Sequence, residues 1–128
     1  MPMSSFAAKG ASLIWGAGWH RFQTIGLKIA AITIAELWHG VERAAEPQKS
    51  KRRKYLETVV AALPIVPYTE QTAYEHARIW AELQSAGKMI GSYDLIVAAT
   101  ALERGSHVAT FNKRHFALVK GLHIIEPK

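Results

Sequence analysis

At 128 residues, with 49% apolar and 20% charged residues, the chain has the size and composition of one folded domain with a real core. It contains no cysteine, which excludes a disulfide framework and thiolate zinc sites and fits a cytoplasmic location. The net charge of +6 favours a polyanionic partner, nucleic acid first, whereas no apolar run reaches the roughly 18 residues of a membrane span.

The first 28 residues differ from the rest of the chain. They hold Lys9, Arg21 and Lys28 but no acidic residue, and the stretch 15–20 has neither a helical nor a strand period. A secretory signal is not expected, because no charged start precedes a sustained apolar core and a cleavage site. A transit peptide stays open, but we favour a disordered or non-native leader. We therefore divide the chain into a leader, 1–28, and a folded domain, 29–128.

From Ile29 onward, short apolar runs alternate with helical patterns. The run 29–33 predicts a buried strand, and Thr33 and Glu36 have the spacing of a capping box that opens a helix ending before Pro47. One face of this helix is apolar, with Ile34, Leu37, Trp38 and Val41. A second helix is expected over 49–63, with cations at its start, followed by a short strand at 65–66. The inner face of the second helix holds Leu56, Val59, Val60 and Leu63.

The second half of the chain continues this alternation. Thr69 is expected to cap a helix to about Ser85, and Ser92 to cap another over 93–104, with Gly87 and Gly105 closing them. The predicted inner face of the first is Ala73, Ala77, Trp80, Ala81 and Gln84. That of the second is Leu95, Ile96, Ala98, Ala99 and Leu102. Residues 107–110 and 122–125 predict strands on either side of a turn at 112–116. Strands separated by helices indicate a parallel sheet covered on both faces.

Three polar segments follow a predicted strand or open a predicted helix: 33–36, 92–94 and 110–112. Ligands of open α/β sheets bind beyond the carboxyl ends of the strands, so these segments are expected to converge. The carboxylates of Glu36 and Asp94, the only aspartate in the chain, would suit Mg²⁺ or Mn²⁺, which prefer oxygen ligands. Such a metal activates water and neutralises charge on a phosphate, while the basic surface positions a nucleic-acid backbone.

Each of these residues also has a purely structural interpretation. Glu36 can complete a capping box, and Asp94 can complement the positive end of its helix, an effect of about 0.3–1 kcal/mol. Asn112 can be an ordinary turn residue, and the cations at 51–54 can be a solvated helix face. The histidines show no metal-binding spacing, and the chain has no H-E-x-x-H, P-loop, G-x-S-x-G or cysteine nucleophile.

Three segments resemble, in order and spacing, the motifs of PIN-domain toxins of the VapC type. Residues 31–41 (AITIAELWHGV) resemble the second-strand motif, and residues 90–101 (IGSYDLIVAATA) resemble the third acidic motif. Residues 108–116 (VATFNKRHF), followed by 119–122 (VKGL), resemble the C-terminal motif. The resemblance covers about residues 29–128, and three ordered motifs are more specific than any one alone.

The resemblance implies a three-layer α/β/α domain with a mostly parallel sheet. It implies a Mg²⁺- or Mn²⁺-dependent endoribonuclease toxin that dimerises and is silenced by a small antitoxin whose tail occludes the site. Carried over by position, Glu36 and Asp94 match acidic metal-site residues, and Thr110 matches the hydroxyl residue after the strand. Asn112 stands where many relatives have an acid and some have Asn.

The chain departs from the family at its front. The family opens with a strand that carries an aspartate in a Leu-Asp-Thr or Leu-Asp-Ser motif, and nothing in residues 1–28 matches it. We therefore expect the first strand to be absent or degenerate. With one acid fewer, the site is expected to hold its metal less tightly and the activity to be impaired.

Three functions follow from these observations. The leading one is the metal-dependent ribonuclease toxin. The alternative is a non-catalytic, degenerate PIN domain that binds an antitoxin or a second copy through the helices of Trp38 and Trp80. The third is a basic RNA-binding domain that acts through residues 49–54 without chemistry, and this one predicts binding that is sensitive to salt and independent of metal.

Overall fold

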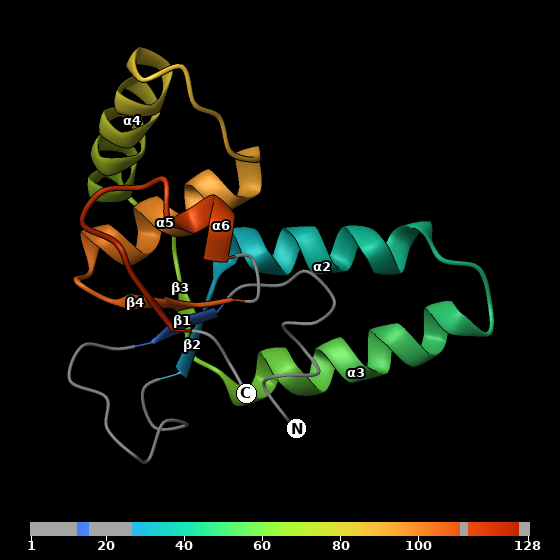
Figure 1. Cartoon of the computed structure of the whole chain (residues 1–128). Helices are drawn as coiled ribbons and strands as arrows, with labels where there is room; N and C mark the ends of the chain where they lie inside the picture. Colours follow the sequence, from blue (N-terminus) through green and yellow to red (C-terminus); the bar gives the residue numbers. More distant parts are fainter. Residues whose placement is uncertain (1–12, 16–26, 111–112, 126–128) are drawn as a thin grey trace.

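The computed structural model describes residues 13–15, 27–110 and 113–125 (Figure 1). One sheet has the strand order β3-β2-β1-β4-β5. Its strands are β1 Leu13–Trp15, β2 Leu27–Ala30, β3 Ile65–Val66, β4 His107–Ala109 and β5 His123–Ile125. The pairs β2–β3 and β4–β5 are parallel, and β1 is antiparallel to both β2 and β4. Four of the five strands therefore run in one direction, which confirms a mostly parallel sheet.

The central position of the sheet belongs to a short, reversed strand. In β1, Ile14 lies opposite Lys28 of β2 on one side and Val108 of β4 on the other. Because β1 runs against its neighbours, its carboxyl end lies at the edge where β2 and β4 begin. The expectation of a degenerate first strand is therefore met by a three-residue strand whose direction differs from that of the other four.

Helices cover both faces of the sheet (Figure 1). They are α2 Ala31–Arg43, α3 Gln48–Ala62, α4 Glu70–Ser85, α5 Ser92–Glu103 and α6 Lys113–Phe116. Successive strand residues point to opposite faces, and the two cores follow this alternation. Ile29 and Ala109 pack with α2 and α3, whereas Ala30 and Val108 pack with α4, α5 and α6. This arrangement confirms the three-layer α/β/α architecture.

The start of α2 differs from the prediction. The strand β2 ends at Ala30, and α2 begins at the next residue without a side-chain cap. Thr33 lies inside the first turn and is fully buried, so the predicted capping box of Thr33 and Glu36 is wrong. Burial against the core, rather than a cap, fixes this end of the helix. The shift moves Glu36 from the first turn of α2 into its second.

Two further predictions are wrong in detail at α4 and α5. Thr69 caps α4 as expected, with a hydrogen bond from the backbone N–H of Thr72, but Gly91 rather than Ser92 is the N-cap of α5. The buried residues of α4 are Thr72, Ile79 and Leu83. The predicted inner face of α4 is wrong, since Trp80 on that face is 53% exposed. The prediction failed because it rested mainly on the regular spacing of alanines. Helix α5 is buried on almost all sides. Its buried residues are Leu95, Val97, Ala98, Ala99, Thr100 and Ala101.

Glycines 40 and 105 are expected to respond oppositely to alanine. Gly105 follows α5 with φ +64°, whereas Gly40 lies inside α2. At both positions an added Cβ would meet no atom within 4 Å, so space does not distinguish them. Gly105→Ala should cost about 1 kcal/mol or more from backbone strain, and Gly40→Ala should stabilise by about 0.5–1 kcal/mol because alanine favours the helix. Urea unfolding of the two variants checks both values. The same sign for both changes would contradict this account.

Candidate functional site

The structure brings Glu36 and Asp94 together at the edge where β2 and β4 end. Glu36 lies in the second turn of α2, which leaves β2 without a linker, and Asp94 lies in the first turn of α5. Burial raises the pKa of the Glu36 carboxyl, and the charge of Asp94 raises it further. The two carboxyl groups are thus close enough for the charge of Asp94 to act on Glu36. The order of strands and helices in the sequence predicted that they would converge.

His115 is the neighbour of Asp94 that sequence reasoning missed. Its Nδ1 atom lies 3.5 Å from Oδ2 of Asp94, and the side chains are 53% and 16% exposed, respectively. Burial raises the pKa of the Asp94 carboxyl, and His115 opposes that rise. Helix α6 presents this imidazole, and the next residue, Phe116, is fully buried and fixes the helix. The available signal was the position of His115 a few residues beyond a strand end.

The remaining predicted site residues lie after β4. Thr110 is 1% exposed and directly follows the strand, and its backbone N–H donates to the carbonyl oxygen of Ile125 at 3.0 Å. This hydrogen bond fixes Thr110 at the sheet edge to which α2 and α5 bring the two acids. Asn112 lies outside the described residues.

The donor chemistry at this edge fits a hard divalent cation. Burial raises the pKa of both carboxyl groups, and the charge of Asp94 raises that of Glu36 further, so a cation between the two carboxylates would stabilise their charged forms. Within the described ranges, no group of three or more histidine or acidic side chains could enclose an ion. Mg²⁺ needs no such cage, because it keeps several waters and binds through one or two carboxylates. The pair therefore fits an ion that stays largely hydrated.

Glu36 also lines a pocket of about 600 Å³ between α2 and α3. Cations from α3 line the opposite wall, where Lys51 and Arg52 lie. The candidate site is thus acidic at the sheet edge and basic on the neighbouring helix. Across the described part of the chain, no helix has the length and apolar character needed to cross a bilayer.

The stability of the chain is expected to depend on pH through Glu36. The pKa of Glu36 is higher in the folded than in the unfolded state, so ionisation of this carboxyl disfavours folding. The free energy of unfolding is therefore highest below the unfolded pKa, about 4.3, and falls as the pH rises through the folded pKa. Glu36→Gln should therefore raise the free energy of unfolding at neutral pH and flatten its fall as the pH rises above about 4. Urea unfolding in EDTA measures this. Glu57→Gln, at an exposed position of α3, is the control and should leave the slope unchanged.

Comparison with known proteins agrees with this geometry. The family model for the PIN domain matches residues 20–122. Ribonuclease VapC1 of Rickettsia felis is 32% identical over 98 residues, which cover 76% of this chain and 73% of that protein. The tRNA(fMet)-specific endonuclease VapC of Salmonella typhimurium is 33% identical over 96 residues, covering 75% and 71%.

Solved structures show the same relationship. DNA-bound VapBC from Salmonella typhimurium matches with a TM-score of 0.72 and 32% identity over 77% of this chain and 73% of that chain. FitAcB from Neisseria gonorrhoeae matches with a TM-score of 0.69 and 28% identity over 77% and 73%. VapBC2 from Rickettsia felis, at 24% identity and a TM-score of 0.74, shares the fold. The chain therefore belongs to the PIN-domain family, among the ribonuclease toxins of the VapC type.

Proposed function

We propose that this chain is a metal-dependent endoribonuclease that hydrolyses RNA phosphodiester bonds as the toxin of a toxin–antitoxin pair. The observation that carries the proposal is the pair of partly buried carboxylates, Glu36 and Asp94, at one sheet edge of a VapC-type domain. A small antitoxin is one proposed partner, because solved relatives are VapBC complexes of toxin–antitoxin systems. A second copy of the chain is the other, as the resemblance of the motifs implies. The proposed place of action is the cytoplasm.

Each residue of the site has a proposed role. Glu36 and Asp94 hold a Mg²⁺ or Mn²⁺ ion, which when bound would favour ionisation of the attacking water and neutralise charge on the phosphate. Thr110 and Asn112 orient the water or the phosphate. Hydrolysis forms a bond from the water oxygen to phosphorus and breaks the bond from phosphorus to a ribose oxygen, while the water loses a proton to solvent and the leaving ribose oxygen takes one up. His115 positions the Asp94 carboxylate through the 3.5 Å contact.

Cleavage of a defined RNA by the full chain tests the proposal. The first substrate to use is tRNA(fMet), because a relative with 33% identity is named as specific for it. Cleavage with Mn²⁺ or Mg²⁺ and none in EDTA is the expected result, at a rate lowered by the missing first acid. Cleavage that persists in EDTA would rule out the metal-dependent mechanism. A folded chain that cleaves neither tRNA(fMet) nor total RNA would favour the second function.

That second function is a non-catalytic domain that binds a partner. Two observations favour it: no acidic residue precedes Glu36, and Trp80 is 53% exposed on α4, where it stacks on His76 at 5.6 Å between ring centroids. Such a domain has no use for an ion. Calorimetric titration with Mn²⁺ separates the two functions, because measurable binding that is lost in Asp94→Asn supports the enzyme.

A further inference from the structure

Helices α2 and α3 form a hairpin (Figure 1). The pocket that Glu36 lines lies between them, next to the carboxylate pair, and we call it the α2–α3 cleft. The α2 wall of the cleft consists of Glu36, Leu37, Gly40 and Val41. The α3 wall consists of Lys51, Arg52, Tyr55 and Leu56. Because Glu36 belongs both to this cleft and to the carboxylate pair, a polymer bound at the pair has its next unit within reach of the cleft.

The charge of the α3 wall is not balanced by acids. Five cations lie within residues 49–54, and the first acid of α3 is Glu57. Lys49 lies 3.8 Å from Glu42, in a solvent-exposed pair that contributes little. Lys51 and Arg52 are exposed, and neither forms an ion pair with an acid in the described part of the chain. These two cations are thus available to an anionic ligand.

The cleft also has an apolar lining that a phosphate alone would not use. Leu37, Val41, Tyr55 and Leu56 line it between the charged residues. A ligand that satisfies both parts has a flat, largely apolar group joined to a phosphate, which describes a nucleotide. A base that is paired and stacked in a duplex cannot enter such a cleft, whereas an unpaired base can be turned out of the strand and packed against side chains.

We propose that the α2–α3 cleft binds one unpaired nucleotide of the RNA beside the scissile bond, with its base on the apolar lining and its phosphates on Lys51 and Arg52. This inference rests on the proposed ribonuclease function and assigns the nucleotide beside the scissile bond a binding site on this chain. Glu36 repels a phosphate on the α2 wall, so the backbone runs along α3.

RNA binding without cleavage tests this inference. A fluorescently labelled single-stranded RNA is titrated in EDTA at several salt concentrations, with the full chain and with Lys51→Gln/Arg52→Gln. The double variant is expected to bind at least about tenfold more weakly, and the slope of log K against log salt should fall by about 1.4, which is two phosphate contacts at about 0.7 each. Circular dichroism checks that the variant folds, as both positions are exposed.

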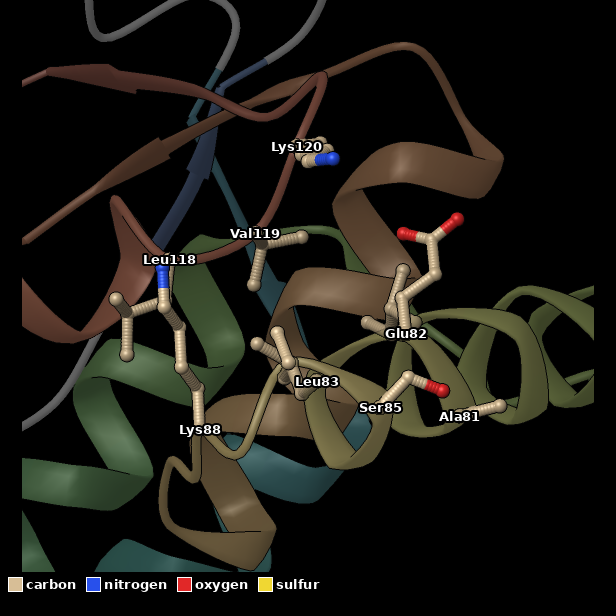
Figure 2. Close-up of a pocket in the computed structure, with 10 residues that line it drawn as sticks. Ala81, Glu82, Leu83, Ser85, Lys88, Leu118, Val119 and Lys120 are labelled. Carbon is tan, nitrogen blue, oxygen red and sulfur yellow. The ribbon is translucent and has the colours of Figure 1, made fainter.

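A matched control removes the same charge elsewhere. Lys88 and Lys120 line a different pocket of about 550 Å³, beside Leu118 and Val119, shown in Figure 2. Lys88→Gln/Lys120→Gln lowers the net charge by the same amount and should weaken binding by less than about threefold. Equal weakening by both double variants would mean that overall charge alone attracts the RNA, and the inference would fail.

Two other ligands separate the remaining explanations. The same sequence as a duplex should bind at least about tenfold more weakly than the single strand. Equal affinity would refute the proposal that the cleft binds an unpaired base turned out of the strand. Polyglutamate of equal charge should bind weakly, whereas tight binding that depends on Lys51 and Arg52 would make the cleft a site for acidic peptides. If this RNA-binding pattern holds but no RNA is cleaved with Mn²⁺, the proposed catalysis fails while the ligand of the cleft stands.

Discussion

Asp94→Asn is expected to lower RNA cleavage by more than about a hundredfold without lowering the thermal midpoint of unfolding. The substitution keeps the shape of the side chain and removes one of the two carboxylates proposed to hold the ion. Loss of a group that merely orients a metal ligand costs about 10- to 100-fold, so loss of a ligand should cost more. Stability should not fall, because burial already raises the pKa of Asp94 and disfavours its charged form in the folded state.

The measurement is the initial cleavage rate of tRNA(fMet) with Mn²⁺, beside the unfolding midpoint at neutral pH in EDTA. Glu57→Gln, which removes an exposed carboxylate of α3, is the control and should change neither value. A second readout is the rise of the midpoint on addition of Mn²⁺, which the unmodified chain should show and Asp94→Asn should lose. Undiminished cleavage by Asp94→Asn would remove this residue from the site.

Phe116→Ala is expected to cost about 3–5 kcal/mol of stability. Phe116 is fully buried in the core formed with α4 and α5, and it is the large apolar side chain of a four-residue helix. So short a helix gains little from its own backbone hydrogen bonds, so the buried ring holds α6 in place. Its loss leaves a cavity and frees the neighbouring His115, so cleavage should fall as well.

Urea unfolding gives the stability change, with Tyr74→Ala as the control. Tyr74 is 60% exposed, so its replacement should change the free energy of unfolding by less than about 0.5 kcal/mol. Since domains of this size are stable by about 5–15 kcal/mol, the Phe116 variant should still fold at low temperature. A loss below about 1 kcal/mol would show that the ring does not anchor α6.

The long helices could be predicted because periodicity and end signals agree there. The prediction 49–63 became α3 at Gln48–Ala62, and Gly87 and Gly105 follow their helices with φ of +69° and +64°. The inner face of α4 could not be predicted, because small alanines mimic an apolar stripe wherever they repeat. The start of α2 was misplaced because the spacing of Thr33 and Glu36 suits a cap, whereas the core contacts of Thr33 are not visible in the sequence.

The candidate site was predictable in part for a related reason. Polar residues beyond strand ends meet at one edge of a parallel sheet, which is why Glu36 and Asp94 could be paired from the sequence alone. His115 also lies a few residues beyond a strand end, but α6 is too short to produce a periodic pattern, so the sequence does not show that this side chain lies beside Asp94. The direction of β1 was also out of reach, since it depends on pairing with β4, nearly a hundred residues away.

The reversed strand β1 also bears on the resistance of this protein to aggregation through exposed strand edges. Its three residues separate β2 from β4 and satisfy backbone groups that both strands would otherwise present to solvent. An uncovered strand edge is a template for the backbone of another molecule and a common origin of aggregation. The outer strands β3 and β5 are only two and three residues long, which leaves little template at the rims. A segment without any site residue therefore protects the solubility of the whole domain.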